Sequence, residues 1–347
     1  MFGKKLASVQ SPKILVIKWG ALGDIAMSTA IIEDIRNKYP KSEIDLNTMP
    51  KFEGFFQEDD RFDCAWSIDL RQKGKAFQNT LSWILYVQKK RYDLIIDLQN
   101  NDRSKIILSL LRLFSFKCPI IVGQHRTFPY HITPEQKDVK PKGIDGLKKM
   151  VTEIGIIPGN EMPVIKVSEK RISHIKKVLR ESGLLMNDFI ILVPGSHASG
   201  HLKRWGDSKY ANLANELWSS KKVRSCIVGG PDDIEVCQNV HNQSVEATVN
   251  LCGTTNILDL IPLGDHALAI IANDTGPAHV LAACNKPIIS ICGPTDPARV
   301  KPLGEKVQTI QADVECKSCY LKECPNQHIC MKSVSTKQVL GLLNAII

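Results

Sequence analysis

The stretch Ala267–Val300, ALAIIANDTGPAHVLAACNKPIISICGPTDPARV, constrains the fold of this chain more than any other. The apolar run Ala267–Ala272 predicts a buried strand, and residues Ala278–Cys284 predict a helix. A second apolar strand is predicted at Pro287–Cys292. A strand, a turn, a helix and a second strand in this order are typical of a parallel α/β sheet.

The turn inside this unit, Asn273-Asp274-Thr275-Gly276-Pro277, has the chemistry of an anion site. The first N–H groups of a helix have no partner inside the helix, and the helix dipole makes that end positive. Thr275 adds a hydroxyl, Gly276 allows close approach to the backbone, and His279 follows Thr275 by one helical turn. A phosphate-bearing ligand with a sugar hydroxyl near Asp274 would fit here.

A purely structural interpretation of the same residues stays open. Asp274 also suits an ordinary helix cap followed by an early proline, and His279 also suits a buried core position.

Composition limits the classes of protein to consider. The chain has 347 residues, enough for two domains, and 45 Lys and Arg against 36 Asp and Glu give a net charge of +9. That charge suits an anionic partner, but the chain lacks RNA-binding signatures and is only 6% aromatic, so we predict no nucleic-acid partner.

The sequence shows neither a secretory signal nor an apolar run of transmembrane length. Its 11 cysteines are best explained as mostly reduced thiols in a cytosolic protein.

The first half opens with a predicted strand, Ile14–Ile17, a glycine-containing turn and a predicted helix from Ile25 to Tyr39. The turn does not match GxGxxG, which disfavours a nicotinamide oxidoreductase. Asp24 lies just before the predicted helix. It is either a helix cap or a carboxylate at the carboxyl end of the first strand, where it can act as a general base.

The second half repeats the strand–helix alternation after a proline-containing stretch, Gly155–Val164, that we interpret as a linker. A predicted strand at Phe189–Val193 ends in Pro194-Gly195-Ser196, and Ser335–Ile347 has the pattern of an amphipathic helix.

Four pieces of this sequence together resemble glycosyltransferase family 9, the ADP-heptose:lipopolysaccharide heptosyltransferases. They are LVIKWGALGDI, then PGS with LKRW, then VGGPDD, and finally NDTGPAHVLAACNKPIISICGPTDP, in the family's order over nearly the whole chain. The resemblance implies an α/β protein with the GT-B fold, two Rossmann-like domains facing each other across a cleft. It implies an acceptor-side domain at 1–160, a nucleotide-sugar domain at 161–334, and a C-terminal helix at 335–347 that crosses back towards the first domain.

The resemblance also implies roles for single residues. Asp24 matches the family's catalytic base, and Lys203 matches its basic residue near the donor phosphates. The other substrate-binding residues that it implies are Ser196, Asp232, Asp274, Thr275, Gly276 and His279, with Asp232 expected near the nucleotide ribose.

The function that follows is an inverting, metal-independent transfer of heptose from ADP-heptose to an anionic glycolipid, the lipopolysaccharide inner core. No cofactor is expected, and the enzyme is expected in the cytoplasm, peripheral at the inner face of the inner membrane. Gly206 follows Lys-Arg-Trp where the family often has proline, so another donor sugar or a protein acceptor stays open. A non-catalytic nucleotide-binding protein is the alternative from another class, and it would not need Asp24.

Cys316, Cys319, Cys324 and Cys330 lie within fifteen residues, just before the last predicted helix. Thiols at this density, with His328 as an alternative ligand, can hold zinc or iron as a structural metal, or they can remain a loop of reduced thiols. We predict no metal in the catalytic site and none that the reaction requires.

Overall fold

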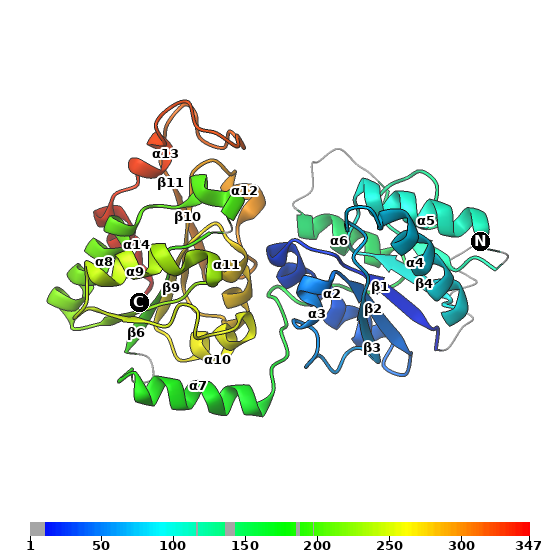
Figure 1. The fold of residues 1–347 in the computed structure, drawn as a ribbon, viewed down its shortest axis with the longest axis horizontal. Helices are drawn as coiled ribbons and strands as arrows, with labels where there is room; N and C mark the ends of the chain where they lie inside the picture. The colour runs from blue at the N-terminus through cyan, green and yellow to red at the C-terminus, as the bar shows by residue number, and fades with distance from the viewer. Residues whose placement is uncertain (1–10, 116, 136–142, 185–187, 197) are drawn as a thin grey trace. The chain divides into compact units, whose positions relative to one another are not determined.

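The computed structural model describes residues 11–115, 117–135, 143–184, 188–196 and 198–347. The chain divides into two compact units, Met1–Asn160 and Glu161–Ile347, and the division falls inside the stretch interpreted as a linker. Figure 1 shows that each unit is a sheet with helices packed on it, and each is described by itself below.

The first unit contains a five-stranded parallel sheet in the order β3-β2-β1-β4-β5. Its strands are β1 (Ile14–Ile17), β2 (Ile44–Thr48), β3 (Cys64–Ser67), β4 (Leu94–Asp97) and β5 (Ile120–Val122). Its helices are α2 (Leu22–Lys38), α3 (Pro50–Glu53), α4 (Ala76–Lys90), α5 (Asp102–Phe114) and α6 (Gly143–Thr152).

The second unit contains a six-stranded parallel sheet in the order β11-β10-β9-β6-β7-β8. Its strands are β6 (Phe189–Val193), β7 (Arg224–Ile227), β8 (Thr248–Asn250), β9 (Ala269–Asn273), β10 (Ile288–Cys292) and β11 (Val307–Gln311). Its α-helices are α7 (Glu169–Glu181), α8 (Asp207–Lys221), α9 (Ile234–Asn242), α10 (Leu260–Asp265), α11 (Gly276–Leu281), α12 (Pro297–Val300), α13 (Ile329–Lys332) and α14 (Thr336–Ile346). The described residues of this unit also form the 3₁₀ helices η1 (Ala198–Lys203), η2 (Pro231–Asp233), η3 (Ile257–Asp259) and η4 (Ala282–Cys284).

Both sheets have the strand order of a Rossmann fold, and the predicted α/β class with two Rossmann-like domains is confirmed. In each sheet the chain builds outward from the first strand in one direction and then returns to build in the other. The order therefore reverses between β1 and β4 in the first sheet and between β6 and β9 in the second. Ligands of open α/β sheets bind at such a reversal, beyond the carboxyl ends of the strands.

The central strands are apolar except at their carboxyl ends because helices cover both faces of each sheet. All four residues of β1 are fully buried, as are those of β9. In the first unit, α4 and α5 pack against one face of the sheet, and α2 packs with α6. The core is therefore formed by the same strands that carry the site residues at their carboxyl ends.

Two helices begin earlier than the sequence pattern predicts. The predicted helix from Ile25 begins at Leu22, so Asp24 lies in the first turn of α2, and the N-cap is Ala21. The Asp24 carboxylate accepts a hydrogen bond from the Ala21 N–H at 3.2 Å. The helix predicted from Ala278 begins at Gly276, since Pro277 fits the first turn, where an N–H has no helical partner.

The last helix, α14, packs on α8 and β10, and its Val339 and Leu343 belong to the core of the second unit. Its expected course back towards the first unit stays a prediction. Among the described helices, none is both long enough and apolar enough to cross a membrane.

A buried amide, Asn47 at β2, joins two tryptophans in the core of the first unit. Its Oδ1 accepts hydrogen bonds from Trp19 Nε1 and Trp83 Nε1, each at 2.7 Å. All three side chains are buried, so neither indole N–H has water as an alternative partner. This explains how the first strand-to-helix turn accommodates tryptophan.

We expect Asn47→Ala to destabilise the first unit, because two buried indole donors lose their acceptor at a cost of about 1–3 kcal/mol each. The melting temperature should fall by roughly 4 °C or more in a thermal denaturation experiment. Gln78→Ala, which removes an exposed amide on α4, is the control and should leave the melting temperature unchanged. An Asn47→Ala protein that melts with the wild type would contradict this account.

Candidate functional site

An ion pair between a partly exposed lysine and a buried carboxylate lies at the strand-order reversal of the second sheet. Lys203 Nζ is 2.7 Å from Asp274 Oδ2, and it joins the loop after β6 to the residue that follows β9. The Asp274 side chain is 5% exposed and that of Lys203 is 34% exposed. A lysine ammonium has three donors, so Lys203 can bind Asp274 and still present donors to an anion from solvent.

Asn273, the last residue of β9, is fully buried and holds the surrounding loops together. Its Nδ2 donates to the carbonyl oxygens of Pro194 at 2.8 Å and Gly195 at 3.1 Å. Its Oδ1 accepts from the backbone N–H of Trp205 and from the Tyr210 hydroxyl, both at 3.1 Å. The loop after β6 and the segment that follows Lys203 are therefore fixed to β9 by one side chain.

Ser196 is buried in this loop, where its hydroxyl donates to the Gly200 carbonyl at 2.8 Å. Its backbone N–H donates to Asp233 Oδ1 at 2.9 Å, and Arg204 donates to its carbonyl oxygen at 3.1 Å. A Cβ on Gly195 would lie 2.1 Å from the Asp233 carboxyl carbon, so glycine is required there. The Ser196 hydroxyl therefore donates its one hydrogen bond within the loop itself.

Asp233 supports this loop, whereas the residue that the sequence singled out, Asp232, is exposed beside it. Asp233 also accepts from the Gly230 N–H at 3.2 Å and pairs with Arg204 at 3.5 Å. Burial raises the pKa of Asp233, while these backbone donors and the Arg204 charge oppose the rise. Sequence analysis missed Asp233 and Arg204, although both belong to the motifs VGGPDD and LKRW.

Three further residues that the sequence singled out, Thr275, Gly276 and His279, follow Asp274 at the start of α11. Thr275 is the N-cap, the position that the capping interpretation gave to Asp274, and its hydroxyl donates to the Asn273 carbonyl at 3.4 Å. Gly276 is the first helical residue and is partly exposed, whereas His279 is buried. Asp274 is still strand-like, since its N–H donates to the Ile291 carbonyl of β10, and its side chain binds Lys203 instead of capping.

In the first unit, Asp24 lines a cavity of about 190 Å³ at the reversal between β1 and β4. The cavity is lined by Lys18, Asp24, Met27, Leu98, Gln99, Asn100, Gln124, Ile144 and Leu147. Its polar lining consists of amides together with one ammonium and one carboxylate. Such groups donate and accept hydrogen bonds at the same time, as the hydroxyls of a sugar require.

Two buried charged residues belong to this part of the first unit, Lys18 in the cavity lining and Asp97 at the end of β4. Lys18 is 4% exposed and donates to the Leu98 carbonyl at 3.1 Å. Burial lowers the pKa of Lys18, while the charges of Asp24 and Asp97 oppose that change. Burial likewise raises the pKa of Asp97, although the hydroxyls of Tyr130 and Ser104, both at 2.7 Å, stabilise its charged form. Sequence analysis missed Lys18, although it directly follows the first strand.

The four clustered cysteines lie together near the Lys203 loop. With Leu202, Pro294 and His328 they line a small cavity, and His328 Nε2 contacts the Leu202 carbonyl, one residue before Lys203. Within the described residues, no three His, Cys, Asp or Glu side chains are arranged to hold a metal ion. The cluster therefore packs against the loop that carries the candidate phosphate-binding lysine.

Comparison with known proteins now defines the class to which these sites belong. The family model of glycosyltransferase family 9 (heptosyltransferase) matches residues 82–330. The chain is 25% identical over 327 residues to lipooligosaccharide heptosyltransferase 2 of Haemophilus influenzae, covering 86% of this chain and 88% of that protein. The fold is similar to the family 9 glycosyltransferase of Veillonella parvula, with a TM-score of 0.79, 21% identity, and coverage of 96% of this chain and 97% of that one.

A second solved structure, E. coli ADP-heptose lps heptosyltransferase II, matches with a TM-score of 0.71 and 21% identity, covering 96% of this chain and 98% of that chain. The predicted GT-B fold class is confirmed by these structural neighbours. The chain belongs to glycosyltransferase family 9, the heptosyltransferase family, and it is a glycosyltransferase.

Alanine variants of the neighbouring residues Asp232 and Asp233 test the hydrogen bonds that hold the loop after β6 in the second unit. Asp233→Ala should lower the melting temperature by several degrees, because it removes a partly buried acceptor of two backbone N–H groups and the partner of Arg204. Asp232→Ala is the matched control, since its side chain is exposed, and it should melt with the wild type. Equal melting temperatures for the two variants would exclude the role given to Asp233.

Proposed function

We propose that this glycosyltransferase moves heptose from ADP-heptose to an anionic glycolipid acceptor, the inner core of lipopolysaccharide, with inversion at the anomeric carbon. The observation that supports this best is the Lys203–Asp274 pair at the strand-order reversal of the second sheet. The names of the relatives, lipooligosaccharide and lipopolysaccharide heptosyltransferases, support heptose and this acceptor. The enzyme would work in the cytoplasm, peripheral at the inner face of the inner membrane.

The donor diphosphate is assigned to Lys203 and to the start of α11. Asp274 is buried and fixes the ammonium through a bond of 2.7 Å, while about a third of the Lys203 side chain stays exposed to receive phosphate oxygens. Thr275 and Gly276 begin a helix whose positive end favours the same charge. His279 lies one turn along this helix, Ser196 shapes the facing loop, and exposed Asp232 is assigned to the ribose.

Transfer needs a base for the acceptor hydroxyl and stabilisation of the leaving group. Asp24 takes the hydroxyl proton as the acceptor oxygen attacks the anomeric carbon from the face opposite the diphosphate. The bond from that carbon to the phosphate oxygen breaks, and ADP departs with the electron pair. Lys203 and the α11 N–H groups neutralise the growing negative charge, so the proposal requires no catalytic metal and no cofactor.

The cavity beside Asp24 is assigned to the acceptor sugar. Its amides, from Gln99, Asn100 and Gln124, can donate to and accept from sugar hydroxyls. Lys18 is buried and lines the same cavity as Asp24, so an ammonium and the proposed base lie side by side where the acceptor sugar would bind.

Nucleotide binding to the purified protein tests the donor assignment. We expect ADP to bind more tightly than UDP or GDP in calorimetry. Asp274→Ala and Lys203→Ala should each weaken ADP binding by roughly 10- to 100-fold, the cost of one charged hydrogen bond. Lys301→Ala, an exposed lysine of the same unit, is the control. A preference for UDP or GDP would reassign the donor, and folded protein without nucleotide binding would refute the proposal.

The base assignment predicts a separation of binding from turnover. Asp24→Asn keeps an acceptor for the Ala21 N–H but cannot take a proton, so kcat should fall roughly 100-fold or more while ADP affinity stays unchanged. Asp60→Asn, an exposed carboxylate of the same unit, should leave both unchanged. Wild-type turnover by Asp24→Asn would remove Asp24 from the mechanism.

A further inference from the structure

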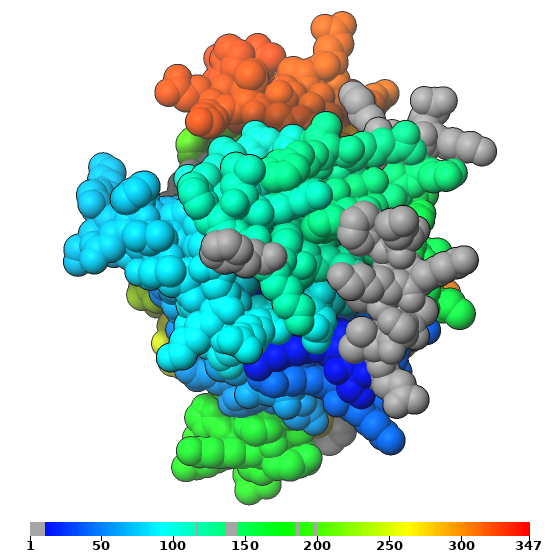
Figure 2. Space-filling view, turned by 90° about the vertical axis from the view of Figure 1, so that its right-hand side faces the viewer, coloured from blue at the N-terminus to red at the C-terminus, as the bar shows by residue number. Residues whose placement is uncertain are grey.

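The two helices α4 and α5 of the first unit lie side by side and expose large apolar side chains. Gln88 of α4 joins them, since its Nε2 donates to the Phe114 carbonyl at 2.9 Å and to Ser115 Oγ at 3.2 Å. Segments in the light-blue to cyan range, to which both helices belong, cover much of the face seen in Figure 2. The buried sides of both helices meet the same core, so their opposite sides share one outer surface.

The exposed apolar residues of α4 lie on the flank that faces α5. Phe77 is 85% exposed, and Leu81 and Leu85 follow at intervals of four residues. Gln88 comes three residues after Leu85 and seven after Leu81, so it lies on the same helix face. Because Gln88 contacts the end of α5, this apolar stripe points towards that helix.

A second apolar stripe runs along α5. Ile106, Leu113 and Phe114 are all exposed, the last two at 68%, and their spacing of seven and eight residues puts them on one face. Arg112 points away from this face, since it donates to the Pro129 carbonyl at 2.7 Å. The two stripes together form what we call the α4–α5 surface: Phe77, Leu81, Leu85, Ile106, Leu113 and Phe114.

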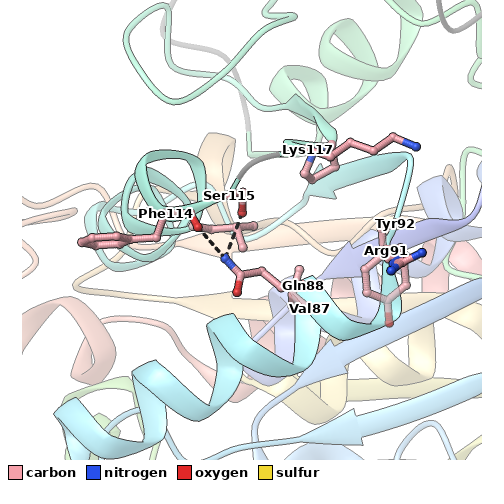
Figure 3. A pocket seen from close by; sticks show the side chains of 9 residues that line it. Val87, Gln88, Arg91, Tyr92, Phe114, Ser115 and Lys117 are labelled. Atoms are coloured by element: carbon pink, nitrogen blue, oxygen red, sulfur yellow. Dashed lines mark hydrogen bonds between the residues drawn. The ribbon is translucent and has the colours of Figure 1, made fainter.

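A cavity of about 520 Å³ opens where both helices end. Figure 3 shows Phe114 at one end of it and the side chains of Arg91 and Lys117 at the other, with Gln88 between them. Arg91 and Lys117 are both exposed, and Lys89 is exposed nearby at the end of α4. Among the described residues that line the cavity there is no carboxylate, and Arg91 and Lys117 make its mouth positively charged.

The charged residues of α4 and α5 are almost all basic. Helix α4 has no Asp or Glu, and the only acidic residue of α5 is Asp102, its first residue. A second copy of the chain would place this basic surface against itself, which repulsion between like charges opposes. An occupant that is both anionic and apolar is favoured, and a phospholipid bilayer with anionic headgroups has that combination.

We propose that the α4–α5 surface docks the protein on an anionic phospholipid bilayer. The six apolar side chains enter the boundary between headgroups and acyl chains, and Arg91 and Lys117 bind lipid phosphates at the mouth of the cavity. The inference deepens the proposed function and rests on it for its purpose, because it identifies where the enzyme meets the membrane that holds its acceptor. Docking itself needs neither donor nor acceptor.

Co-sedimentation of the full chain with vesicles tests this surface. Vesicles of equal parts phosphatidylglycerol and phosphatidylcholine should bind the protein roughly tenfold or more tightly than vesicles of phosphatidylcholine alone, and added salt should weaken that binding. Two double variants, Phe77→Ser with Leu85→Ser and Arg91→Glu with Lys117→Glu, should each weaken it roughly tenfold or more. The matched control is Lys301→Glu with Lys306→Glu, which makes the same change in net charge on exposed lysines of the second unit and should bind nearly as the wild type does.

The remaining outcomes separate this inference from its alternatives. Equal losses in the α4–α5 variants and in the control, equal binding to neutral vesicles, or no binding by the wild type would each overturn it. A wild-type dimer that the Phe77→Ser, Leu85→Ser variant converts to monomer in sedimentation would assign the surface to a second copy instead. ADP affinity measured on the same variants should not change, so vesicle binding can succeed or fail independently of the donor assignment.

Discussion

Asn273 is the side chain on which the geometry around the Lys203–Asp274 pair depends. Without its amide, the carbonyl oxygens of Pro194 and Gly195 and the N–H of Trp205 would lose a buried partner, since Asn273 itself is fully buried. These contacts fix the loop after β6, and Trp205 fixes the position of the segment just after Lys203. Asp274 follows Asn273 directly, so one residue sets the loop and the next pairs with its lysine.

The sequence predicted the fold class well because buried parallel strands leave a strong local signal. Apolar runs that end in glycine and polar residues identified β1, β6, β9 and β10 and the turns that carry most site residues. The helix starts were predicted late by two or three residues, since α2 begins at Leu22 and α11 at Gly276. In both cases the first helical turn contains residues whose types are typical of loops, such as Gly-Pro, although the backbone there is already helical.

Roles that depend on distant partners could not be predicted from local patterns. Asp232 and Asp233 look alike in the sequence, yet only Asp233 meets the Ser196 N–H, 37 positions away. Lys18 looks like an ordinary residue after a strand. Its ammonium group is held in the first unit by the carbonyl oxygen of Leu98, which is 80 positions away in the sequence. Lys18 and Asn273 share one feature, a buried polar side chain at or directly after the carboxyl end of a strand. Asp233 lies six residues beyond the end of β7, so only the folded chain shows its contact with the loop after β6.

The same Rossmann order supports different electrostatics in the two sheets. In the second, a buried carboxylate positions a partly exposed cation, which suits recognition of an anion. In the first, Lys18 and Asp97 are both buried, and hydroxyls and carbonyls satisfy them beside an amide-lined cavity, which suits an uncharged sugar next to one base. Topology therefore fixes where each ligand can bind, while the residues after the strands decide its charge.

In the first unit, α5 connects the cavity beside Asp24, which we propose for the acceptor sugar, to the α4–α5 surface. Asn100 lines the cavity beside Asp24, Asn101 caps α5, and the helix then runs to Phe114 at the basic cavity. Thirteen helical residues span about 20 Å. A glycolipid whose acyl chains stay in the bilayer must raise its acceptor sugar above the headgroups. Docking along α5 would keep the cavity within about that helix length of the membrane. The proposed base, Asp24, and the proposed membrane surface therefore have a geometric reason to belong to the same unit.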